Sequence, residues 1–70
     1  MNLIDAVRLY CHIMQQAGGG LVGRKAGSDA LHNHNVHQEV VESISRCVTN
    51  EGALISGSGS RFAITQIADS

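Results

Sequence analysis

Aromatic side chains are scarce in this chain of 70 residues, which has one tyrosine, one phenylalanine and no tryptophan. A hydrophobic core must therefore be built mainly from aliphatic side chains. The length suits a single domain with a small core over residues 1–70. Domains of this size are marginally stable alone, and dimerisation is a common remedy. Hydrophobic residues make up 43% of the chain and charged residues 16%, which argues against intrinsic disorder.

Basic residues are also few. Five lysines and arginines stand against six aspartates and glutamates, so the net charge is −1 with neutral histidines. The chain as a whole thus lacks the positive charge that favours binding to nucleic acid. No apolar run approaches the roughly 20 residues of a membrane-spanning helix, and no basic segment precedes an apolar run as in a secretory signal. We therefore expect a cytoplasmic protein that makes no membrane contact.

Motifs for catalysis and for cofactor binding are missing as well. The three glycines at 18–20 follow an expected helix and precede no Gly-Lys-Ser/Thr sequence, which argues against a phosphate-binding loop. No spacing of serine, histidine and aspartate indicates a catalytic triad. Glu42 lies three residues after Glu39 but four before Arg46, which is typical of an ion pair on a solvated helix face. We therefore expect neither enzymatic activity nor a cofactor.

Cysteines and histidines are the remaining candidates for special chemistry. Cys11 and Cys47 each fall on the apolar face of an expected helix. The simpler interpretation is two buried thiols in a reducing compartment, while a disulfide between them stays open. His32, His34 and His37 lie close together, but their spacing matches no usual zinc pattern. We expect a polar turn without a metal site, and the His-Asn-His triplet does not indicate a nuclease because no hairpin precedes it.

Helical periodicity is clear in two segments, of which residues 2–17 form the first. Asn2 is the expected N-cap, and Asp5 lies in the first turn, where the helix dipole favours a carboxylate. The apolar surface of this helix is wide for one core. The excess either forms part of a homodimer interface or is enclosed by the rest of the chain, and both remain open. The expected core comprises Leu3, Val7, Cys11, Met14, Val40, Val41, Ile44, Val48, Leu54, Phe62 and Ile64.

The second periodic segment begins near residue 35. Asn35 is its expected N-cap and Gly52, in a left-handed conformation, its expected stop, so the helix should span about residues 35–50. The alternation of residues after Gly52 then predicts a short strand at 53–55, a flexible tip at 56–60 and a returning strand at 61–65.

This order of a helix, a sharp stop and a hairpin resembles the C-terminal half of a winged helix-turn-helix domain. The resemblance depends on residues 50–55 as the helix end and first wing strand, on 57–62 as the wing tip and return, and on three buried helix positions, Val41, Ile44 and Val48. Residues 35–37 resemble the turn, with Asn35 where a positive φ is often needed. The resemblance implies a small α+β domain with about three helices followed by a β-hairpin wing. Residues 21–34 are either a short strand and helix or a loop.

The resemblance also implies a regulatory protein that binds double-stranded DNA, with helix 35–50 in the major groove and the wing at 53–65 beside it. Side chains on the helix would contact bases, and basic side chains before the helix and on the wing would hold phosphates. The expected DNA-binding residues are Arg24, Lys25, Gln38, Glu42, Arg46, Ser58 and Arg61.

The alternative is a protein-binding module that makes no contact with DNA. Low net charge and the wide apolar face of the first helix favour a small adaptor or inhibitor, of the size that phages and plasmids often encode. It would act through that helix and through dimerisation. Basic residues gathered on one face with the polar side of helix 35–50 favour DNA, whereas scattered basic residues and an exposed apolar patch favour a protein partner.

Overall fold

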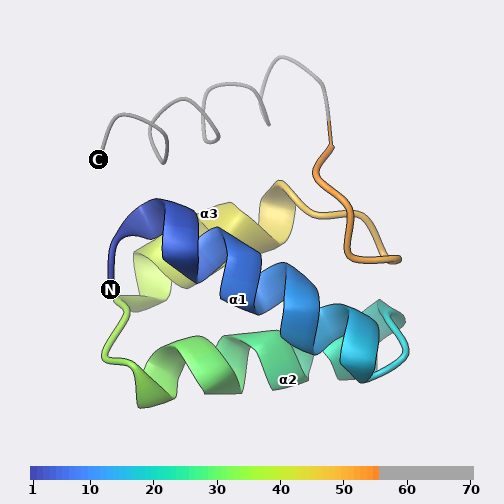
Figure 1. Cartoon of the computed structure of the whole chain (residues 1–70), viewed down its shortest axis with the longest axis horizontal. Coiled ribbons are helices and arrows are strands. Elements are labelled where there is room, and N and C mark those ends of the chain that lie inside the picture. Colours follow the sequence, from blue (N-terminus) through green and yellow to red (C-terminus); the bar gives the residue numbers. More distant parts are fainter. Residues whose placement is uncertain (56–70) are drawn as a thin grey trace.

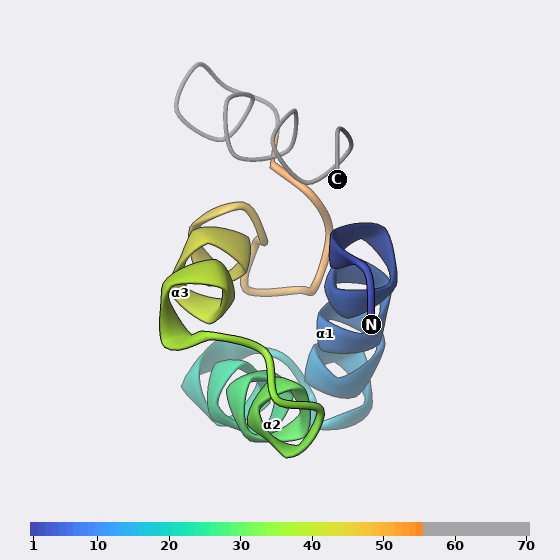
Figure 2. The same ribbon diagram turned by 90° about the vertical axis from the view of Figure 1, so that its left-hand side faces the viewer.

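Three helices make up most of the folded domain. The computed structural model describes residues 1–55, without the side chain of Leu3. The helices are α1 (Leu3–Gln16), α2 (Gly20–Asn33) and α3 (Gln38–Arg46), and they pack around one core (Figure 1). Figure 2 shows the three helices at the corners of a triangle, α2 and α3 nearly end-on and α1 obliquely, with the chain after α3 running back towards α1.

The α+β winged-helix prediction is wrong. Within residues 1–55 the structure is a three-helix domain with no strand beyond an isolated β-bridge, and no hairpin wing is seen. The bridge joins Val48 to Leu54, flanked by hydrogen bonds from Thr49 N to Ala53 O (2.7 Å) and from Ile55 N to Cys47 O (2.8 Å). Residues 53–55 therefore form an isolated bridge with the chain directly after α3 and not the expected strand of a hairpin. The expected tip at 56–60 and return strand at 61–65 lie outside the described residues.

The first helix agrees closely with its prediction. Helix α1 begins one residue after the expected start, and the Asn2 cap is confirmed because Asn2 Oδ1 accepts a hydrogen bond from Asp5 N at 2.8 Å. Its inner face supplies the largest share of the core. Four of its side chains are buried there, namely Ala6, Val7, Tyr10 and Met14.

The second helix is the largest departure from the sequence prediction. Residues 20–33 form one continuous helix, where a short strand and helix or a loop were expected. Two glycines on its inner face bring its backbone against α1. A Cβ atom at Gly23 would lie 2.8 Å from Met14 Cγ, and one at Gly27 would lie 2.9 Å from Tyr10 Cδ2. These glycines therefore serve close helix packing, although glycine normally indicates a loop.

The connection between α2 and α3 is a short turn at residues 34–37. Asn35 has a φ of 61°, which confirms the expected left-handed position. The expected capping role of Asn35 is wrong, because α3 begins at Gln38 with His37 as its N-cap. The expected stop at Gly52 is also wrong. Helix α3 ends at Arg46, and Gly52, with a φ of 91°, lies in the following turn, where its N–H donates to Thr49 O at 3.0 Å.

In the described part of the chain, the core cluster includes three residues that the predicted core lacked, Ala6, Tyr10 and Leu31. Tyr10 and Leu31 are fully buried, and Leu54 is 52% exposed, so its predicted burial is wrong. Phe62 and Ile64 lie outside the described residues. Burial is confirmed for five predicted core residues, Val7, Met14, Val41, Ile44 and Val48, and is partial for Cys11 and Val40.

Candidate nucleic-acid interface

The outer face of α3 is the most distinctive polar surface of the domain. The inner face of this helix buries Val41 and Ile44 in the core. The outer face carries no large apolar side chain and leaves its polar residues exposed, namely Gln38, Glu39, Glu42 and Arg46. The helix joins α2 through the tight turn at Asn35, and Gln38 and Glu39 in its first turn are exposed, as Asn35 is.

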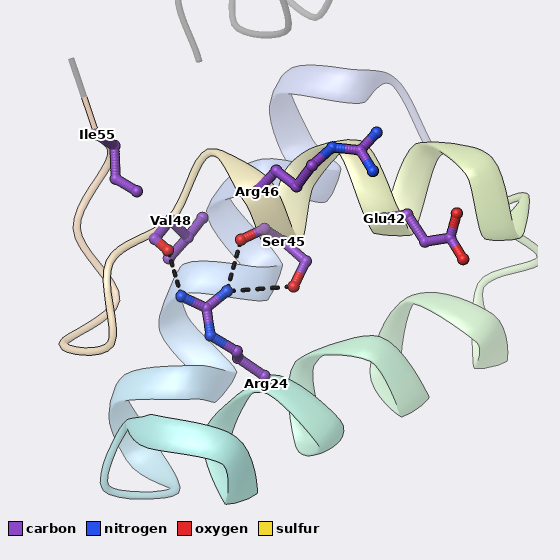
Figure 3. A pocket seen from close by; sticks show the side chains of 6 residues that line it. All are labelled: Arg24, Glu42, Ser45, Arg46, Val48 and Ile55. Carbon is purple, nitrogen blue, oxygen red and sulfur yellow. Dashed lines mark hydrogen bonds between the residues drawn. The ribbon is translucent and has the colours of Figure 1, made fainter. Parts of the chain in front are cut away.

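Two of the expected DNA-binding residues contact each other on this face. Gln38 Nε2 donates a hydrogen bond to Glu42 Oε1 at 3.3 Å, one helical turn away. The sequence predicted an ion pair between Glu42 and Arg46, but these two described side chains do not form one. Arg46 is exposed, and in Figure 3 no hydrogen bond joins it to the other residues drawn, Glu42 among them. Within residues 1–55 the Arg46 guanidinium thus has no acidic partner, while Glu42 accepts from Gln38.

The Arg24 guanidinium donates its hydrogen bonds within the domain, at the end of α3. Its Nη1 donates to Ser45 O (2.5 Å) and to Ser45 Oγ (3.2 Å), and its Nη2 donates to Val48 O (2.6 Å) and Asn50 Oδ1 (3.3 Å) (Figure 3). The last carbonyls of a helix lack hydrogen-bond donors within the helix. A cation near them also interacts favourably with the negative end of the helix dipole. Arg24 satisfies both requirements, so its role within the domain is structural.

Ser45 connects this contact to the first helix. Its hydroxyl oxygen accepts hydrogen bonds from Arg24 and from Tyr10 OH, the latter at 3.0 Å. One serine thus joins side chains from all three helices. Sequence reasoning missed it, although a signal was present. Ser45 follows Val41 by four residues and lies on the inner side of the helix, where a polar residue needs a hydrogen-bonding partner.

A shallow depression lies beside this contact. It has a volume of about 440 Å³ and opens widely to solvent, and Arg46 and Arg24 lie on different parts of its wall (Figure 3). The Arg24 guanidinium already donates to several acceptors, whereas in the described part of the chain no hydrogen bond of the Arg46 guanidinium is seen. The lining residues are Arg24, Glu42, Ser45, Arg46, Val48 and Ile55.

Within residues 1–55, Lys25 is the remaining expected basic contact. Lys25 lies on the exposed side of α2 and forms an ion pair with Asp29, with 3.2 Å between Nζ and Oδ2. Such an exposed pair is easily broken by a competing anion, so Lys25 can still contact a phosphate. Ser58 and Arg61 lie outside the described residues. The structure therefore brings Gln38, Glu42 and Arg46 together and assigns Arg24 to a different task.

An apolar surface is exposed on the first turn of α2. Leu21 is 85% exposed and Val22 is 72% exposed. The sequence placed the excess apolar surface on the first helix instead. There, Leu9 and Cys11 pack partly against the core, and Ile4 is 38% exposed. The strongest apolar candidate for an interface is thus the pair Leu21 and Val22.

The cysteines and histidines carry no arrangement for chemistry in the described part of the chain. No disulfide joins Cys11 and Cys47, and burial raises the pKa of both thiols. Within residues 1–55, no three side chains of histidine, cysteine, aspartate or glutamate gather as a metal site would require. Over the same residues, no helix combines the length and apolar content needed to cross a bilayer.

Comparison with known proteins gives no relative for this chain, because no family model, no curated protein sequence and no solved structure matches it.

Proposed function

We propose that this domain binds double-stranded DNA through the unit formed by α2, the turn at 34–37 and α3. The observation that carries the proposal is the geometry of that unit. Two helices meet at a short turn with a left-handed residue, and the second helix buries one face and leaves a polar face free. In helix-turn-helix proteins the second helix of such a unit enters the major groove.

The free face of α3 has suitable chemistry for reading bases. Its amide, carboxylate and guanidinium groups follow one another at single-turn intervals, at Gln38, Glu42 and Arg46. Base edges in the major groove present donors and acceptors that these groups complement. Arg46, at the end of the helix and without an acidic partner among residues 1–55, is suited to a phosphate oxygen.

Charge sets the expected strength of binding. Affinity for duplex DNA depends largely on the phosphates that lysines and arginines neutralise. Arg24 is committed to the end of α3, and Glu39 and Glu42 on the outer face oppose phosphate. We therefore expect weak binding by a single copy, which strengthens at low salt and on dimerisation.

The test is a gel shift with random-sequence duplex over a series of salt concentrations. The variant Arg46→Ala should weaken binding and lower the slope of log affinity against log salt by about 1. Arg8→Ala is the matched control, because it removes an exposed arginine from α1 and should leave the slope unchanged. Absence of a shift for the unmodified protein at low salt, or equal effects of both variants, would contradict the proposal.

A second candidate is a protein-binding module, which the exposure of Leu21 and Val22 favours. Two large apolar side chains on one turn are unfavourable in water and are typical of a surface that another protein covers. The partner that we propose is a second copy of this chain, because a domain this small gains stability by dimerisation.

Sedimentation measurements test this second candidate. The protein should sediment as a dimer at high micromolar concentration, and the double variant Leu21→Ser with Val22→Ser should sediment as a monomer. Leu54→Ser is the matched control, because Leu54 is also exposed but lies in the segment after α3. A monomeric unmodified protein would exclude self-association and leave the DNA proposal standing.

A further inference from the structure

The hydrogen bond between Gln38 and Glu42 determines how α3 presents its first base-reading group. A glutamine amide has one carbonyl oxygen and one NH₂ group, and in isolation it can turn either end outward. An ionised carboxylate can only accept hydrogen bonds. The 3.3 Å contact between Gln38 Nε2 and Glu42 Oε1 therefore fixes which end of the amide faces Glu42.

The remaining groups of this pair form an edge rich in acceptors. Gln38 keeps its carbonyl oxygen and one N–H, and the Glu42 carboxylate keeps further lone pairs. Adenine presents an acceptor, N7, and an amino donor, N6, in the major groove, whereas guanine presents two acceptors, N7 and O6. Adenine complements this edge, and guanine would place its O6 against oxygens.

We infer that Gln38 and Glu42 act together to select adenine and reject guanine at one position of the DNA site. Gln38 makes the two hydrogen bonds to the base, and Glu42 is a positioning residue that orients the Gln38 amide and repels guanine O6. The inference rests on the proposed DNA-binding function of α3.

Glu39 provides a matched control for Glu42. Both are exposed glutamates on α3, so truncating either removes one negative charge and should raise general affinity for duplex to a similar extent. The side chain of Gln38 bonds to Glu42, whereas the bond that involves Glu39 joins its backbone carbonyl to Ser43 Oγ at 2.9 Å. A change seen in Glu42→Ala and not in Glu39→Ala therefore reports on the pair.

The experiment is selection from a random-sequence duplex library at low salt, followed by sequencing. The unmodified protein should enrich adenine over guanine at one position by on the order of tenfold. Gln38→Ala should abolish this preference, Glu42→Ala should reduce it severalfold by admitting guanine, and Glu39→Ala should leave it unchanged. In the free protein, the NMR signals of the Gln38 side-chain amide should shift in Glu42→Ala and not in Glu39→Ala.

Each outcome separates the inference from the function on which it rests. If the unmodified protein retains no duplex, the proposed function and the inference both fail. If duplex is retained but Glu42→Ala keeps the full preference for adenine, the inference alone is overturned. Equal responses of the Gln38 amide signals to the two truncations would likewise overturn it, whatever the DNA results.

Discussion

The pair of helices α1 and α2 and the segment of residues 38–55 are held in the same domain by different physical means. Helix α2 lies so close to α1 that glycine is required at the contact, and the interface is filled by Tyr10 and Met14. The segment of residues 38–55 also buries Val41, Ile44 and Val48, but the end of α3 is held in addition by hydrogen bonds from the single side chain of Arg24 to carbonyl oxygens. Apolar packing of the first kind is lost only on global unfolding, whereas the second kind can open locally.

Because of this difference, the stability of the domain and its proposed function depend on different parts of the molecule. The helix that we propose to contact DNA buries two side chains in the core, Val41 and Ile44, and depends on Arg24 for its C-terminal end. Changes to the side chains buried between the first two helices, such as Tyr10 and Met14, should therefore destabilise the whole domain. Changes at Arg24 should alter α3 and the chain after it while leaving the pair of helices intact.

The largest expected effect is that of Tyr10→Ala. The ring is fully buried against Gly27 and is the only aromatic side chain in the described part of the chain. Its removal should cost about 3–5 kcal/mol, which is most of the stability of a small domain. Tyr10→Phe is the control, because it removes only the hydrogen bond to Ser45 and should cost about 1 kcal/mol. Urea denaturation followed by circular dichroism measures both, and equal losses would show that the ring itself contributes little.

The next largest effect is that of replacing a glycine of α2 with alanine. Whether this change stabilises or destabilises the domain tests how closely α1 and α2 approach each other. On an exposed helix, replacing glycine with alanine stabilises by about 1 kcal/mol. At Gly23 the new Cβ would lie 2.7 Å from Met14 O, a backbone atom that cannot move aside cheaply. We expect Gly23→Ala to be destabilising by about 1–3 kcal/mol in urea denaturation. A stabilised variant would mean that α1 and α2 are further apart than described.

The same glycines explain how far the sequence could predict the fold. The first helix, its Asn2 cap and the left-handed Asn35 follow from local rules and were predicted. Helix α2 has a glycine content that local propensity assigns to loops, and its stability comes from packing on α1, a tertiary effect that propensity does not contain. The wing prediction failed because residues 53–55 pair with residues 47–49, and period-2 alternation does not identify the partner of a strand.

The candidate site was predictable in part for similar reasons. Gln38, Glu42 and Arg46 lie on the free face of α3, as helical periodicity indicates. Arg24 was predicted to bind phosphate because it is basic and lies in a polar stretch. Two of its four acceptors are backbone carbonyls that follow it by 21 and 24 residues, and no residue type in the sequence identifies them. Basic side chains that cap a distant helix end cannot be distinguished from free ones without the fold.

Arg24→Ala should have an effect of intermediate size that is confined to one region. The carbonyls of Ser45 and Val48 would lose their donors, at a cost of about 1–3 kcal/mol. Lysine cannot restore the forked contact, so Arg24→Lys should recover little of the loss. The control Lys25→Ala breaks only an exposed ion pair and should change stability by less than about 0.5 kcal/mol.

Hydrogen exchange locates the Arg24 effect. In Arg24→Ala, the amides of α3 and of residues 47–55 should exchange faster by a larger factor than those of α1 and α2. A uniform increase over the three helices would show that α3 opens only with the whole domain. That result would contradict the distinction between the apolar packing of α1 on α2 and the hydrogen bonds that hold the end of α3.

The smallest expected effect is a dependence of stability on pH above neutrality. Burial raises the pKa of the Cys11 thiol, and burial also raises that of Cys47, although the nearby charge of Arg46 acts in the opposite direction. A pKa raised in the folded state means that folding favours the neutral thiol. The resulting stabilisation is complete below the pH at which an unfolded thiol ionises, about 8.5, and is lost as pH rises through the folded pKa.

Thermal unfolding at a series of pH values checks this expectation and compares the two regions once more. The melting temperature should decline above about pH 8.5, and Cys11→Ala and Cys47→Ala should each flatten part of the decline.

Cys11 lies in α1, whereas Cys47 is the C-cap of α3 in the region that Arg24 holds. Local opening exposes Cys47 without unfolding α1, so at high pH a thiol reagent should gain access to Cys47 more readily in Arg24→Ala, with little change at Cys11. Equal acceleration at both thiols would indicate that the domain opens as one unit.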